Sequence, residues 1–183
     1  MTLGEGKRKV YELLDEYSGG AQQVDADLEA KMADFFDIAQ KKLAQVSRIY
    51  RTRTLERQSG ITEYELPEDC LELCRVWRDG RPWNGFRRKA DRLLVPERTE
   101  GALELEYAAL PADISESTTD GYEFEVGEAA AQAMPFFVAA QVLSADLVQD
   151  AGTLLGLYQV MVSDLPGGGP GGLPRVDNSF YRA

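Results

Sequence analysis

An uncharged stretch in the C-terminal half constrains the fold of this chain more than any other feature. Seventeen residues between Glu128 and Asp146, AAAQAMPFFVAAQVLSA, contain no ionisable side chain, and the apolar character continues to Val162. A helix that is apolar on all sides needs partners on all sides. We therefore predict that Val126–Val162 forms the buried centre of a helical core.

The same stretch is a poor candidate for a membrane span. A bilayer requires about 20 consecutive apolar residues, whereas here Pro135 interrupts the run and Asp146 and Asp150 follow it. The charged segment GEGKRK near the start also differs from a secretory signal peptide. We expect a soluble protein that makes no contact with a membrane.

Composition limits the chemistry that the chain can perform. Its 183 residues are 44% hydrophobic, its net charge is −11, and no Lys or Arg lies between Arg98 and Arg175. A surface of that kind repels phosphate, so we expect no sequence-specific binding of nucleic acid. Histidine, the commonest general base and metal ligand, is absent. We predict no catalytic residues, no metal site and no cofactor.

Two cysteines, Cys70 and Cys74, lie in the segment DCLELC. Their spacing suits neither a redox CxxC pair nor a four-ligand zinc site. They would face the same side of a strand, or lie one turn apart on a helix. We expect two free, buried thiols in a reducing compartment.

The apolar spacing predicts two amphipathic helices at the start, at about 7–18 and 25–50. Val10, Leu13, Leu14 and Tyr17 form one stripe on the first helix. The second helix begins with acidic residues and ends with basic ones, which matches the helix dipole. Its apolar positions are Leu28, Met32, Phe35, Phe36, Ala39, Leu43, Val46 and Tyr50.

A period of two then predicts a β-rich insert over about 51–110. The segment RTRTLERQSGITEYELP alternates around Ser59-Gly60, as the arms of a hairpin do. Asp79-Gly80 predicts a second hairpin, and Leu93–Pro96 and Leu103–Tyr107 are two further strands. We expect a small antiparallel sheet of about four to six strands.

Two more helices are predicted at about 122–148 and 150–163, the first capped by Thr118, Thr119 or Asp120 and interrupted or kinked at Pro135. The predicted fold is therefore α+β and mainly α. A bundle of about four helices over 1–165 carries the β insert, and 166–183 form a flexible partner-binding tail. The candidate partner-binding residues of this tail are Arg175, Val176, Asn178, Phe180, Tyr181 and Arg182.

The insert holds the other candidate binding residues. Trp77, Trp83 and Phe86 are typical of a sheet core, but Trp83 and Phe86 are also close to Arg87 and Arg88 in the sequence, so these four are a candidate subunit or tail interface. A wider basic group has two interpretations, a charged sheet edge that blocks aggregation or a patch for an acidic partner. That group comprises Arg48, Arg51, Arg53, Arg57, Arg87, Arg88 and Lys89.

The order of these parts resembles the head–tail connector (adaptor or head-completion) proteins of tailed bacteriophages. The resemblance rests on LPEDCLELCRVWRDGRPW, LELEYAALP and TTDGYEFEVGEAAAQAMPFFVAAQVL, and it covers about residues 1–165. In that family a Leu-Pro-x-Asp step leads to a strand that ends in an Asp-Gly turn. Tyr107 to Pro111 match a strand end of the family, and Phe137–Ala140 match its aromatic-Val-Ala-Ala helix core.

This resemblance implies a structural protein of the virion, made in the bacterial host cytoplasm, and not an enzyme. Connectors form homo-oligomeric rings, commonly twelvefold, at the phage neck. There they join the portal of the DNA-filled head to the tail or stopper proteins and line the DNA exit channel without reading sequence. The C-terminal tail would reach the portal. We expect the residues around Pro135–Phe137 to pack against a neighbouring subunit.

Two alternatives stay open at this point. One is a tail-completion or tail accessory protein with a different docking partner. The other is a cell-wall hydrolase that works with carboxylates alone, which requires two carboxyl groups facing each other across a cleft.

Overall fold

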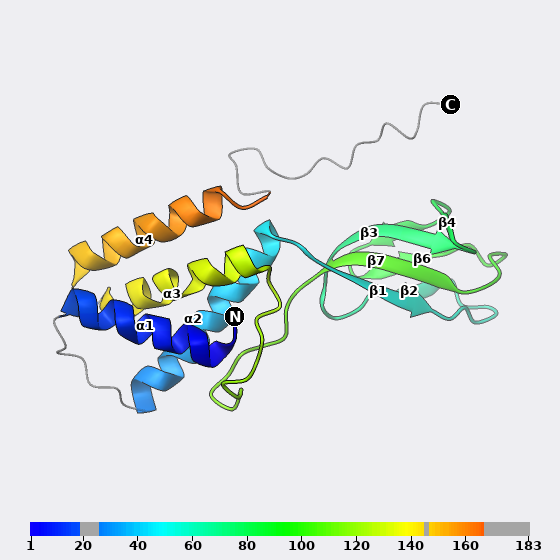
Figure 1. The fold of residues 1–183 in the computed structure, drawn as a ribbon. Coiled ribbons are helices and arrows are strands. Elements are labelled where there is room, and N and C mark those ends of the chain that lie inside the picture. The colour runs from blue at the N-terminus through cyan, green and yellow to red at the C-terminus, as the bar shows by residue number, and fades with distance from the viewer. Residues whose placement is uncertain (19–25, 145–146, 167–183) are drawn as a thin grey trace. The chain divides into compact units, whose positions relative to one another are not determined.

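The structure, a computed structural model, describes residues 1–18, 26–144 and 147–166 and has an α+β fold (Figure 1). It divides into two compact units, a helical unit (residues 1–47 and 111–183) and a β unit (residues 48–110). The helices are α1 (Leu3–Ser18), α2 (Ala26–Val46), α3 (Glu128–Leu143) and α4 (Val148–Ser163). The strands are β1 (Ile49–Leu55), β2 (Glu63–Glu65), β3 (Cys70–Arg78), β4 (Arg81–Pro82), β5 (Arg87–Lys89), β6 (Arg92–Leu94) and β7 (Leu103–Ala109).

Helix α3 lies at the centre of the helical unit and contacts each of the other three helices (Figure 1). Ala131, Met134 and Val138 are almost completely buried. Pro135 is also buried and lies inside α3, so it does not begin a new helix. The uncharged composition of α3 follows from this central position. Among the described residues, no helix is both long and apolar enough to cross a membrane.

Helix α2 ends at Val46, four residues before the predicted end, and β1 begins at Ile49. Tyr50, predicted on the helix, therefore lies in a strand, where it is opposite Ala108 of β7. The whole of β1 pairs with β7 in an antiparallel register. Pairing along seven residues gives hydrogen bonds to more backbone N–H and C=O groups than one further turn of helix α2 would. This explains why the helix ends earlier than predicted.

The predicted helix start near Tyr122 is wrong, because α3 begins at Glu128 after Gly127 and has no side-chain cap. The segment before it pairs with the N-terminus instead. The Leu3 backbone N–H donates to the Tyr122 carbonyl (2.8 Å), and the Phe124 ring stacks on Phe36 of α2 with 5.4 Å between centroids. Backbone groups that a helix would have used are satisfied in these contacts.

Gln40 of α2 fixes this loop to the helical unit. Its side chain is completely buried. Gln40 Oε1 accepts a hydrogen bond from the Glu125 backbone N–H (2.9 Å), and Nε2 donates to the Tyr122 hydroxyl (3.1 Å). One turn earlier, Asp37 Oδ1 accepts from the Ile114 backbone N–H (3.0 Å). A buried amide with partners on both atoms holds the 112–125 loop in one place.

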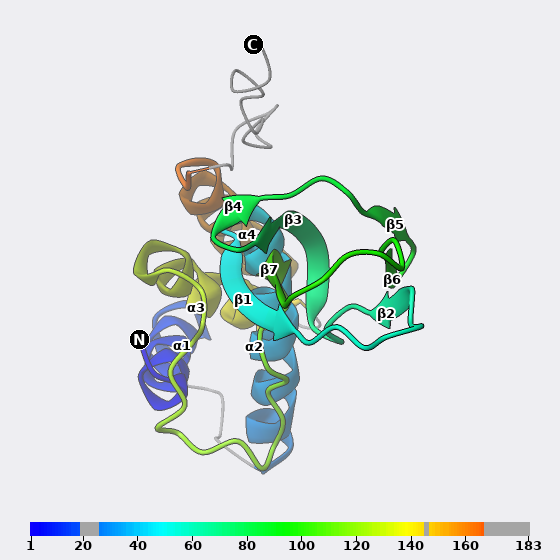
Figure 2. The same ribbon diagram turned by 90° about the vertical axis from the view of Figure 1, so that its right-hand side faces the viewer.

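The β unit contains two antiparallel sheets, one with the strand order β1-β7-β3-β4 and one with the order β2-β6-β5 (Figure 2). Their inward side chains form a single apolar cluster. Leu93, Leu103 and Leu105 are at most 1% exposed. The alternation predicted for Leu103–Tyr107 is confirmed, since Leu103, Leu105 and Tyr107 are buried and Glu104 is exposed.

The predicted hairpin around Ser59-Gly60 is wrong, because its two arms belong to different sheets. The first arm pairs with β7 and the second with β6. The chain between them folds around buried Tyr64, whose hydroxyl accepts from the Gln58 backbone N–H (3.0 Å) and donates to the Ile61 carbonyl (3.1 Å). Period-two alternation marks a strand but does not identify its partner.

The hairpin predicted at Asp79-Gly80 is confirmed. It joins β3 to β4, and Asp79 and Gly80 have positive φ angles of 52° and 71°. Two-residue hairpin turns of this type require positive φ at both positions, which Asp-Gly adopts at low cost.

Candidate functional site

The two groups of predicted interface residues have different outcomes. The residues from Arg175 to Arg182 lie outside the described part of the chain, so their role stays a prediction. Trp83, Phe86, Arg87 and Arg88 are all described and lie in and directly after the connection from β4 to β5. This connection forms one wall of a surface cavity.

Trp83 begins the connection and is tied to the sheet, since its backbone N–H donates to the Val76 carbonyl (2.8 Å). Its indole lies against the Phe86 ring with 6.0 Å between centroids, and both rings pack on the apolar core of the β unit. Gly85 is needed between them, because a Cβ there would lie 2.5 Å from the Trp83 ring. The two aromatic residues are thus half-buried parts of the core, not exposed anchors.

The cavity beside this connection has a volume of about 490 Å³ and opens to solvent. Its lining is more apolar than polar. No carboxylate lines it. The lining residues are Thr62, Asn84, Gly85, Phe86, Arg87, Leu94, Val95 and Pro96.

Arg57 braces the segment after β6, of which Pro96 lines the cavity. Its guanidinium donates to the carbonyl oxygens of Thr99 (3.1 Å), Pro96 (3.3 Å) and Glu97 (3.1 Å), and it lies over the Tyr64 ring. A rigid planar donor with several acceptors suits this task. Arg57 is therefore engaged within the chain and is not part of a patch for a partner.

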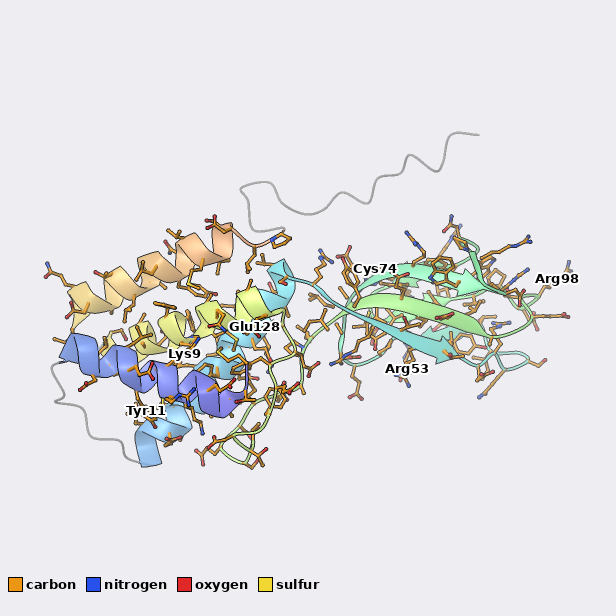
Figure 3. The ribbon with its side chains drawn as sticks, viewed as in Figure 1. Lys9, Tyr11, Arg53, Cys74, Arg98 and Glu128 are labelled. Carbon is orange, nitrogen blue, oxygen red and sulfur yellow. The ribbon has the colours of Figure 1, made fainter. Side chains whose placement is uncertain are left out.

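The rest of the predicted basic group does not form one patch. Arg48 is paired with Glu72, and Arg51 is paired with Asp69. Arg53 lies on β1 (Figure 3), in a different sheet from the β5 residues of the group.

Arg87, Arg88 and Lys89 of β5 are all exposed, and of the three Arg87 lines the cavity. Arg88 Nε donates to the Ala90 carbonyl (3.1 Å). Strand β5 is an edge of its sheet, so its charges also disfavour pairing with another strand.

The cysteines differ from the prediction. Both are free, but Cys70 is half-buried and Cys74 is exposed. Two register shifts in β3, one after Cys70 and one between Leu73 and Arg75, break the simple alternation. Cys70 therefore packs on the core while Cys74 does not. Partial burial raises the pKa of both thiols, which makes them weak nucleophiles near neutral pH.

The cavity combines apolar lining residues, which can cover an apolar side chain, with Arg87, which can donate to a hydrogen-bond acceptor. Among the described residues, no group of three or more His, Cys, Asp or Glu side chains could hold a metal ion. A smaller cavity of about 250 Å³ is lined in part by Asp79 and Glu104. Asp79 is paired there with Arg78 (3.6 Å).

Comparison with protein-family models and with curated protein sequences gives no match. The function is therefore argued from the geometry. The sequence indicates Phe86 and Arg87 but not the other apolar part of the lining, which Leu94, Val95 and Pro96 provide. Leu93–Pro96 is predicted as a strand, yet nothing in it indicates that Leu94 pairs with Arg87.

Proposed function

We propose that this chain is a structural protein of a tailed-phage neck, which forms a ring between the portal of the head and the tail. The observation that carries the proposal is the order of the elements. Two helices precede the β unit and two follow it, and the two pairs meet in one helical unit. This is the order that the resemblance to head–tail connectors implies. In this proposal the four helices act as a bundle that packs beside its copies around the ring.

The distribution of charge supports the same function. Residues 48–110 carry twelve basic and twelve acidic side chains, so the β unit is neutral. The helical unit carries eight basic and nineteen acidic side chains, and thus the whole net charge of −11. A wall of that sign lets DNA slide past without binding it. We therefore propose that the helical unit, not the β unit, faces the DNA channel.

The β unit would then carry the contact with a neighbouring protein. Its cavity is lined by Phe86, against which Trp83 packs, and by the exposed Arg87, next to Arg88, and in this proposal it accepts an apolar side chain next to a hydrogen-bond acceptor. We assign this surface to a tail or stopper protein or an adjacent copy. The portal contact belongs to the tail residues Arg175, Val176, Asn178, Phe180, Tyr181 and Arg182.

The experiment that tests the proposal mixes the purified full chain with the portal protein encoded in the same genome. Electron microscopy and native mass spectrometry should show ring-shaped complexes that contain both proteins. In the double variant Phe180→Ala, Tyr181→Ala, portal binding should weaken while the circular dichroism spectrum stays unchanged. A chain that remains monomeric and does not bind the portal would overturn the proposal.

A further inference from the structure

Asn84 and Gly85 form the middle of the connection from β4 to β5 in the β unit (Figure 2). The connection is anchored on both sides of this pair. The Trp83 backbone N–H donates to a carbonyl oxygen of β3 (2.8 Å), and the Phe86 ring packs on the apolar core. Asn84 and Gly85 themselves are exposed and belong to no helix or strand. Asn84 is the only asparagine among the described residues.

An asparagine that precedes a glycine can lose its side-chain amide without an enzyme. The backbone nitrogen of the glycine loses its proton and attacks the asparagine Cγ, and the side-chain nitrogen leaves as ammonia. A cyclic imide remains, and a water molecule opens it at one of its carbonyl carbons. The products are aspartate and isoaspartate, so the net reaction consumes water and releases ammonia. Glycine promotes the attack because it has no Cβ to hinder it and its backbone is conformationally permissive.

The surroundings of Asn84 favour this reaction. Within the described residues, the Gly85 backbone N–H donates no hydrogen bond, so no such bond has to break before the nitrogen loses its proton. Because both residues are exposed, water and hydroxide reach them. Both also lie outside the strands, so the backbone can rotate toward the cyclic imide without breaking the hydrogen bonds of a sheet.

Packing against Trp83 keeps a glycine at the position where it makes Asn84 reactive. A Cβ at Gly85 would lie 2.5 Å from the Trp83 ring, which is closer than real Cβ atoms approach other groups. A bulkier residue after Asn84 would slow the attack on its amide, but the fold disfavours one there. The reactivity of Asn84 is therefore a consequence of the way in which the connection packs.

We infer that Asn84 is a site of spontaneous deamidation, which adds a carboxylate to the lining of the cavity in the β unit. Asn84 and Arg87 both line this cavity, and no carboxylate lines it before the reaction. The new carboxylate can pair with the Arg87 guanidinium in place of an acceptor on a ligand. Isoaspartate also lengthens the backbone by a methylene group directly before Gly85, beside the Trp83 ring. The inference does not depend on the proposed function, because it concerns the chemistry of the chain alone.

The test incubates the full-length chain at several mildly alkaline pH values and maps its peptides by mass spectrometry. The peptide that contains Asn84 should gain the mass of an amide-to-acid change, and the protein should gain a negative charge in ion-exchange chromatography. The rate should rise with pH, because the Gly85 nitrogen must lose its proton. Asn84→Gln should remove the change, since the longer side chain closes a ring less readily. Asn178, which precedes a serine, is the internal comparison and should react more slowly.

The same measurement on the chain unfolded in guanidinium chloride separates the effect of the fold from that of the sequence. The rate at Asn84 in the folded chain should lie within about tenfold of the unfolded rate, which corresponds to a barrier at most about 1.4 kcal/mol higher. The modified protein, separated by ion exchange, should have a changed near-ultraviolet circular dichroism spectrum, because the contact of Gly85 with Trp83 is altered, and an unchanged helical signal.

Three outcomes count against the inference. A folded-state rate at Asn84 more than about tenfold below the unfolded rate would show that the connection protects the amide, and would overturn it. Deamidation of the folded chain at an unchanged rate in Asn84→Gln would assign the reaction to another residue. A modified protein with the tryptophan spectrum of the unmodified chain would overturn the effect on the Trp83 contact. None of these outcomes bears on the proposed ring, which is tested by portal binding.

Discussion

The two units of this protein differ in net charge and in where their charged residues lie. The β unit is neutral, and some of its arginines are paired within it, as Arg48 is with Glu72 and Arg51 with Asp69. The helical unit has the whole net charge of −11, yet α3 and α4 have almost no charged residue. Its charge is therefore concentrated away from one apolar layer. In α4, Val148, Leu157 and Val160 are nevertheless exposed.

The largest effect is expected from a substitution that creates a cavity in the core of the β unit and so tests whether the two units are stabilised separately. Leu105 is 1% exposed, and Leu105→Ala should lower the free energy of unfolding of this unit by about 2–5 kcal/mol. Both tryptophans, Trp77 and Trp83, lie in the β unit. Urea unfolding followed by tryptophan fluorescence therefore reports this unit, and helical circular dichroism reports the other.

Tyr50→Ala is the matched control, because Tyr50 is also in the β1–β7–β3–β4 sheet but is 57% exposed. It should change the fluorescence midpoint much less than Leu105→Ala does. We expect the helical signal to shift less than the fluorescence in Leu105→Ala. Equal shifts of both signals would contradict the division into two separately stabilised units.

The second prediction concerns the buried polar anchor of the helical unit. Gln40→Leu removes the hydrogen bonds that the Gln40 side chain makes with the Glu125 backbone N–H and the Tyr122 hydroxyl, so it should cost about 1–3 kcal/mol. Urea unfolding followed by helical circular dichroism measures the loss. Gln45→Leu makes the same change at an exposed position of α2 and should be near neutral. If the two variants have the same stability, Gln40 does not anchor the loop.

The smallest effects are expected from replacing one glycine in each unit by alanine. Gly85→Ala forces the Trp83 ring out of its position, at a cost of about 1 kcal/mol, and should change the near-ultraviolet circular dichroism of the tryptophans. Gly121→Ala, in the helical unit, adds a methyl group in open space and should leave both stability and spectrum unchanged. An unaltered tryptophan spectrum in Gly85→Ala would show that the cavity wall is looser than the structure indicates.

Most elements were predictable because each has a local signal. The stripe at Val10 and Leu14 indicated α1, and the Asp79-Gly80 pair indicated the β3–β4 hairpin. The errors fall where two local signals compete. Tyr50 fits both the helical spacing of α2 and the alternation of β1, and pairing with β7 decides between them.

The candidate site was predictable only on one side. Aromatic residues followed by arginines, as at Trp83 and Arg87, indicate a binding surface by composition alone. The brace by Arg57 could not be predicted. It joins carbonyl oxygens about forty positions away, at Pro96 and Thr99, and backbone acceptors carry no side-chain signal.

The sequence by itself determined that the chain has an apolar helical core, a β-rich insert and an acidic surface, because these follow from spacing and composition. The tertiary structure decided which apolar residues are covered. Apolar residues lie on all sides of both predicted helices in Val126–Val162. The sequence therefore cannot distinguish α3, which is enclosed, from α4, which is covered on one side. Burial depends on neighbours that are distant in the chain, and only their packing revealed that Val160 is open and Phe137 is not.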